Sequence, residues 1–180
     1  MRKVRKWIAF LFSKFQLNRS SPLFWHRFGK VYAVNNSYMF SKQETQQLKK
    51  DFWIAFGKSF PRKWLLYDTK IKDFSFKFYA DNKKAEVSID IEMKDELFRN
   101  AYFEKIWSLE SLLEEEVGEV LKDEFYTLEN GKVISRFWVT KENVSIFNKN
   151  TWQEIFEFFV QKMEAFERFY YEYEDFIKDV

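Results

Sequence analysis

The chain is 180 residues long, the length of one domain, and can bury about two thirds of the surface that its unfolded form exposes. It contains no cysteine and a single histidine, His26. The lack of cysteine excludes disulfides, thiolate catalysis and cysteine-ligated zinc, and a single histidine argues against histidine-rich metal sites, so we expect any catalysis to use carboxylates, lysine, tyrosine or serine. The lack of cysteine also fits a reducing compartment, and we expect a cytoplasmic protein. Aromatic residues make up 22% of the chain, which predicts an aromatic core.

The formal net charge of +2 hides a division within the chain. Residues 1–38 hold eight basic and no acidic residues, whereas the remainder holds 22 basic and 28 acidic residues. Apolar residues recur at helical spacing within residues 1–17, among basic ones, and this pattern fits peripheral membrane association. The alternative that we favour is a disordered or mis-started extension over residues 1–38, with translation from Met39 and a single α+β domain over residues 39–180.

The first element expected after Met39 is an amphipathic helix. Ser41 and Glu44 form a capping box, in which each side chain bonds a free backbone amide at the start of the helix. We expect the helix to end at Gly57, where a left-handed cap residue belongs. Its apolar stripe consists of Leu48, Phe52, Ala55 and Phe56. The run that follows, residues 63–67, is predicted to be a short first strand.

Two further amphipathic helices are predicted nearer the C-terminus. One begins with the acidic pair Asp95 and Glu96 and ends at Gly118. The other begins at Thr151, which forms a second capping box with Glu154, and spans about 40 Å if it is unbroken. Its apolar stripe consists of Ile155, Phe156, Phe159, Val160, Met163, Phe166, Tyr170, Tyr173 and Ile177.

Alternating apolar and polar residues predict a β-hairpin over residues 74–94, with a polar turn at residues 81–84. Asn130-Gly131 predicts a second hairpin with a tight primed turn, because both residues accept a positive φ. Residues 144–147 are expected to add a short strand. The fold class is therefore α+β, an antiparallel or mixed sheet of about five strands with three amphipathic helices packed mainly on one face.

Several local strings, taken in this order of elements, resemble a bacterial family catalogued as domain of unknown function 4268. The strings are Ser41 to Glu44, Phe52-Trp53 with Gly57, Phe74 to Phe76, Asp81 to Ala85, Ile89 to Ile91, Val144 to Asn148, and Trp152. The resemblance covers residues 40–178 and leaves out the first 38, which supports a start at Met39. It implies that members occur alone or fused behind nuclease-like modules, and it carries over no functional residue.

One candidate catalytic site lies on the first hairpin. Asp90, Glu92 and Lys94 are alternate residues, so their side chains are expected on one face, with Asp81 at the turn end of the partner strand. PD-(D/E)XK nucleases use such an acidic pair to hold a divalent ion and a lysine to activate water. Asp81, Asp90 and Glu92 are therefore candidate ligands for Mg²⁺ or Mn²⁺, and Lys94 is a candidate catalytic partner. The same pattern is typical of the solvated face of a sheet in a chain that is 32% charged.

The function that we favour is a non-catalytic protein-interaction module with no cofactor and an unknown protein partner. Its binding surface would be the outer face of the sheet or the C-terminal helix, with Tyr170 to Glu174 as the candidate segment. The acidic balance of residues 39–180 does not favour nucleic acid as a partner. The alternative is a divalent-metal-dependent, nuclease-like phosphodiesterase of the PD-(D/E)XK type. A second alternative is peripheral membrane association through residues 1–17.

Overall fold

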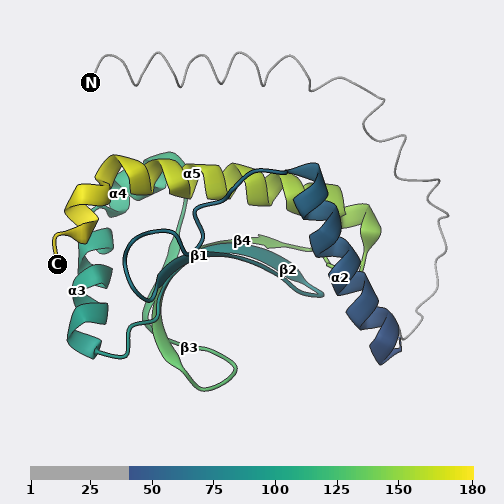
Figure 1. Cartoon of the computed structure of the whole chain (residues 1–180), viewed down its shortest axis with the longest axis horizontal. Helices are drawn as coiled ribbons and strands as arrows, with labels where there is room; N and C mark the ends of the chain where they lie inside the picture. Colours follow the sequence, from purple (N-terminus) through teal and green to yellow (C-terminus); the bar gives the residue numbers. More distant parts are fainter. Residues whose placement is uncertain (1–40) are drawn as a thin grey trace, which may run out of the picture. The chain divides into compact units, whose positions relative to one another are not determined.

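The computed structural model describes residues 41–180, which belong to a compact unit spanning Phe40–Val180 (Figure 1). Its elements are α2 (Lys42–Ser59), β1 (Phe74–Ala80), β2 (Lys84–Ile91), α3 (Glu96–Trp107), α4 (Glu110–Val117), β3 (Leu121–Thr127), β4 (Val133–Glu142), the short 3₁₀ helix η3 (Lys149–Thr151) and α5 (Trp152–Lys178). None of these helices has the length and apolar character needed to cross a membrane. The predictions for residues 1–38, including the membrane helix and the start at Met39, lie outside the described residues.

The four strands form one antiparallel sheet in the order β1-β2-β4-β3. The first hairpin has the register that its alternation predicts, because Phe76 lies opposite Ile89 and Ile89 lies opposite Phe137. Side chains at these positions share one face of the sheet, and all three are buried. The α+β class and the antiparallel sheet are confirmed.

The expected number of about five strands is wrong, because neither residues 63–67 nor residues 144–147 form a strand. In the first segment, the amide of Leu65 bonds the carboxylate of Glu167 on α5 at 2.7 Å, and Leu66 has a φ of 36°. The second segment joins the β1–β2 turn through two hydrogen bonds only, from the amides at 144 and 146. Both segments are apolar because they pack on the core, and their backbones are held by scattered hydrogen bonds instead of a ladder.

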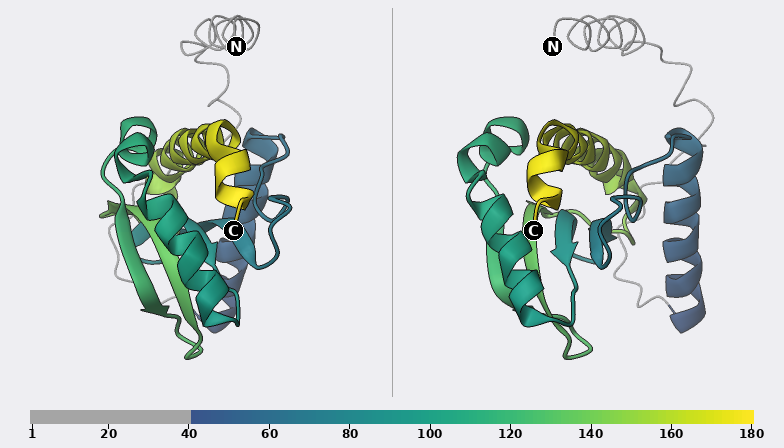
Figure 2. Two further views of the ribbon diagram at one scale, coloured as in Figure 1. Left: turned by 90° about the vertical axis from the view of Figure 1, so that its left-hand side faces the viewer. Right: turned by 60° about the vertical axis from the view of Figure 1, so that its left-hand side comes forward.

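The helices pack on the apolar face of the sheet (Figure 1, Figure 2). Phe76 contacts the rings of Phe166 and Tyr170 on α5, with centroid distances of 6.3 and 5.6 Å. From α3, Phe103 stacks on Phe137 of β4 at 4.8 Å. Aromatic contacts from α2 reach the same core: Phe56 meets Phe78, Phe156 and Phe159. The predicted aromatic core therefore lies between the sheet and the helices.

The helix expected between Asp95 and Gly118 is interrupted after Trp107, so residues 41–180 contain four α-helices instead of the predicted three. Ser108 ends α3 with its hydroxyl bonded to the carbonyl of Lys105 at 2.7 Å. The break changes the direction of the chain before α4, and Leu113 and Val117 of α4 are buried. The end at Gly118 is confirmed, since that residue has a φ of 89°.

Three local predictions at turns and caps are wrong. Gly57 lies inside α2, which runs on to Ser59, because the amide of the next residue beyond the helix still bonds the carbonyl of Phe56 at 3.0 Å. Thr151 makes no cap bond to α5, because its hydroxyl is bonded to the loop residues 145 and 148 instead. The second hairpin has a longer turn than two residues, closed by the amide of Leu128 and the carbonyl at 132, with a positive φ only at Gly131.

Candidate functional site

The face of the sheet opposite the helices carries polar side chains that alternate with the core residues. Asp90 lies opposite Ser75 on one neighbouring strand and opposite Arg136 on the other, and Glu86 lies opposite Tyr79 and Thr140. The centre of this face was expected to be solvated, and that prediction is wrong. Asp90 is 0% exposed and Glu86 is 4% exposed. No described helix packs on this face, so the charged side chains bury one another.

Asp90 is the centre of an ionic cluster, a name that we use for Lys77, Asp90, Glu92, Lys132 and Arg136. Its Oδ1 accepts a hydrogen bond from Arg136 Nε at 2.8 Å, and its Oδ2 accepts one from Nη2 at 2.7 Å. Lys77 Nζ lies 3.1 Å from Oδ2. The bidentate contact follows directly from the sheet register, which places Asp90 opposite Arg136. Both oxygens of this carboxylate are therefore bound to nitrogen donors.

Glu92 extends the ionic cluster toward the second hairpin. Its Oε1 pairs with Lys77, and its Oε2 accepts from Lys132 Nζ at 2.6 Å. Burial alone would raise the pKa of Glu92, but the two lysines outweigh burial and hold that pKa below its ordinary value. Burial would likewise lower the pKa of Lys77, yet Glu92 and Asp90 outweigh it and raise that pKa. Both groups are therefore held in their charged forms.

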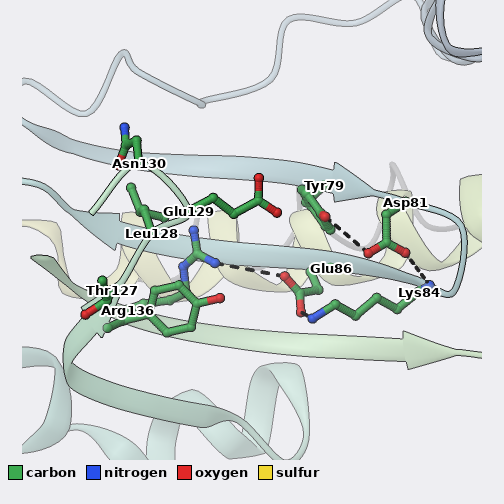
Figure 3. A pocket seen from close by; sticks show the side chains of 10 residues that line it. Tyr79, Asp81, Lys84, Glu86, Thr127, Leu128, Glu129, Asn130 and Arg136 are labelled. Atoms are coloured by element: carbon green, nitrogen blue, oxygen red, sulfur yellow. Dashed lines mark hydrogen bonds and ion pairs between the residues drawn. The ribbon is translucent and has the colours of Figure 1, made fainter. Parts of the chain in front are cut away.

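A pocket of about 510 Å³ opens beside the ionic cluster (Figure 3). It is lined by Tyr79, Asp81, Lys84, Glu86, Tyr126, Thr127, Leu128, Glu129, Asn130 and Arg136. Within it, Glu86 accepts from Lys84 Nζ at 2.5 Å and lies 4.0 Å from Arg136 Nη1. The guanidinium of Arg136 lies over the ring of Tyr126, 4.4 Å from its centroid. All four strands and both hairpin turns therefore contribute to a cavity that is both charged and aromatic.

Asp81 closes the β1–β2 turn at one end of this pocket. Its Oδ1 accepts from the amides of Lys83 and Lys84 at 2.7 and 2.8 Å, and its Oδ2 accepts from the hydroxyl of Tyr79 at 3.1 Å. Burial would raise the pKa of Asp81, but these three donors outweigh it and lower that pKa. Asp81 therefore serves to close the turn. It lies six residues beyond Ser75, the partner of Asp90, which is about 20 Å along the strand.

The structure brings together only two of the four candidate catalytic residues. Asp90 and Glu92 share Lys77, whereas Asp81 lies at the far end of the hairpin and Lys94 is exposed beyond the end of β2. Within residues 41–180, no group of three or more His, Cys, Asp or Glu side chains is placed so that it could hold a metal ion. The donors that surround Asp90 and Glu92 do not fit a divalent ion, which would have to displace Arg136 and two lysines.

The family model described as "Domain of unknown function (DUF4268)" matches residues 48–174. The chain belongs to this family. No curated protein and no solved structure gives a significant match. The DUF4268 match includes the whole ionic cluster and every residue that lines the pocket. The family description names no activity, so functional conclusions depend on the geometry.

Sequence reasoning missed the cations of the DUF4268 ionic cluster. Lys77 alternates with the core phenylalanines, so the sequence pattern could have placed it on the polar face of the sheet. No local pattern places Arg136 and Lys132 in the cluster, because they join it only when β4 pairs with β2, about 46 residues away in the chain. Glu129 was missed as well, since a residue in a hairpin turn has no periodicity that would place it.

Proposed function

We propose that this DUF4268 domain is a non-catalytic interaction module that binds a partner protein through the pocket on the polar face of its sheet. One observation carries the proposal. Asp90, the best candidate for a catalytic carboxylate, is fully buried and bound through both oxygens, whereas the pocket next to it is open. The chemistry that remains available on this face is recognition.

The bound state of the carboxylates supports a structural role for them. Removing one partner from a buried ion pair costs about 3–5 kcal/mol, so a metal ion that displaced Arg136 would meet a large penalty. Lys77 would lose two of its acceptors in the same step. An active site needs carboxylate oxygens that are free to contact a metal or substrate, and the ionic cluster does not supply them.

The pocket supports recognition better than the C-terminal helix does. Tyr170 is 1% exposed and its hydroxyl bonds the carbonyl of Thr69, so it belongs to the core and not to a binding surface. Tyr171 is 59% exposed, and its ring packs edge-to-face on that of the buried Tyr170 at 5.9 Å. In the pocket, by contrast, two tyrosines and several acceptors surround one cavity within the size range of about 300–1,000 Å³ for ligand sites.

The proposal is tested by site-specific photo-cross-linking in cells of the native host. A photoreactive residue replaces Thr127, which is exposed on the rim of the pocket, and a matched control replaces Lys50, which is exposed on α2. We expect a discrete cross-linked polypeptide from position 127 that is absent from position 50 and that disappears when Glu129 is also changed to lysine. Identical products from both positions, or Mn²⁺-dependent DNA cleavage that is lost in Glu92→Gln, would overturn the proposal.

A further inference from the structure

We infer that the pocket binds a basic side chain, the guanidinium or ammonium group of an exposed segment of the partner polypeptide. This inference rests on the proposed interaction function and specifies what the module recognises. It depends on the charges, the aromatic surfaces and the apolar residue that line the pocket.

The charges that line the pocket are not balanced. Both cations already have carboxylate partners, since Arg136 is held by Asp90 and Lys84 by Glu86. The carboxylate of Glu129 has no ion-pair partner among the described residues. Figure 3 shows its side chain extending from the β3–β4 turn across the cavity, with the carboxylate between Arg136 and Tyr79. The group that is missing from this arrangement is a cation.

The surroundings of the Tyr79 phenol, in the same pocket, are electrostatically negative. Burial raises the pKa of this group, and the carboxylates of Asp81, Glu129 and Glu86 raise it further. These three acids come from a turn, a second turn and the strand β2, so their convergence on one phenol is a property of the folded pocket. Of the three, Glu129 is the carboxylate without an ion-pair partner among the described residues, so it is the one with which an entering cation can pair.

The aromatic rings offer a surface on which such a cation can lie. The pocket already contains one example, because the guanidinium of Arg136 covers the ring of Tyr126. Tyr79 is 42% exposed, and no cation covers its ring among the described residues. A guanidinium placed between this ring and Glu129 would make a cation–π contact and a charge-assisted hydrogen bond together.

The lining of the pocket suits a polypeptide better than a free amine. Leu128, an apolar residue of the β3–β4 turn, lines the pocket beside Glu129. Apolar lining residues next to a few placed polar groups are typical of sites that bind organic ligands. This lining suits a segment in which an apolar residue neighbours the basic one.

The test is calorimetric titration of the full-length chain with capped pentapeptides of sequence Ala-Leu-X-Leu-Ala, where X is arginine, lysine, glutamine or glutamate. We expect the arginine and lysine peptides to bind and the other two to give no saturable heat. Glu129→Gln should weaken binding about tenfold, the cost of one charge-assisted hydrogen bond. The matched control is Glu172→Gln on the exposed side of α5, which should bind as the unaltered protein does.

The outcomes separate this inference from the proposed function. Tighter binding of the glutamate peptide would overturn the preference for cations and leave an interaction module. Equal binding by Glu129→Gln and the unaltered chain would place the peptide elsewhere, and argininamide that binds as tightly as the arginine peptide would overturn a polypeptide ligand. If no peptide binds, this inference is wrong, whereas the proposed function is judged independently by cross-linking at position 127.

Discussion

The two faces of the sheet both carry buried side chains, but these are buried by different means. On one face, Phe76, Ile89 and Phe137 are covered by helices and make contacts that have little directionality. On the other, Asp90 is fully buried and depends on its paired charge, Arg136, which contacts it with defined geometry. The apolar face therefore stabilises the fold through the apolar area that it removes from water. The charged side chains of the polar face can be buried without a large energetic cost only while each of them keeps an oppositely charged partner.

The first way to test this comparison is to remove volume from the apolar face. Phe76 is 0% exposed and lies between Ile89 and the rings of α5. Phe76→Ala should lower the free energy of unfolding by about 3–5 kcal/mol, because it deletes a ring and leaves a cavity. Urea denaturation followed by circular dichroism measures the change. A loss below about 1 kcal/mol would mean that the faces have been assigned the wrong way round.

The second test removes one charge from the polar face. Arg136→Met should cost about 3 kcal/mol, because it leaves the carboxylate of Asp90 buried with only Lys77 nearby. The double variant Asp90→Leu/Arg136→Met should return to within about 1 kcal/mol of the unaltered protein, since both charges are then gone. If the double variant is as unstable as the single one, the pair contributes through something other than charge compensation.

A third test uses pH. The pKa of Glu92 lies below its ordinary value of 4.5, so the unfolded chain takes up a proton first as the pH falls. The stability that Glu92 contributes should therefore be complete above about pH 5 and lost as the pH drops below 4.5 through the folded pKa. Glu92→Gln should cost about 1 kcal/mol at pH 7 and flatten this acid dependence. An unchanged pH profile in the variant would show that its lysine contacts do not stabilise the fold.

The smallest expected effects lie at two glycines, outside either face. Gly131 has a φ of 81°, and a Cβ there would meet nothing within 4 Å, so Gly131→Ala should cost about 1 kcal/mol through backbone strain alone. Gly57 lies in an exposed turn of α2 with equally open surroundings, so Gly57→Ala should stabilise by about 0.5–1 kcal/mol. If these backbone conformations are correct, thermal denaturation should show a lower melting temperature for Gly131→Ala and a higher one for Gly57→Ala.

Local sequence patterns were enough to predict the strands and helices that bury only one of their faces. The alternation around Phe76 and Ile89 predicted the register of the first hairpin, and the stripe from Ile155 to Ile177 predicted α5. The break after Trp107 was missed because it depends on how α4 packs on α5. Residues 63–67 have the composition of a strand, but a bond to Glu167 holds them as a loop.

The candidate site was less predictable, because its contacts join distant parts of the chain. Alternation placed Asp90 and Glu92 on one face, as observed, but it did not extend to Lys94 because β2 ends at Ile91. The partner of Asp90 is set by the strand order β1-β2-β4-β3, which no local pattern contains. Without that order, a saturated ion pair and a metal-binding acid look the same in sequence.

The most direct test of the central claim is a Mn²⁺ titration of the full-length chain by calorimetry, run beside Glu92→Gln. The account predicts no saturable heat for either protein, because the oxygens of Asp90 and Glu92 are already bound to Arg136, Lys77 and Lys132. Saturable binding that disappears in Glu92→Gln would contradict the account and return a metal-dependent activity to this face of the sheet.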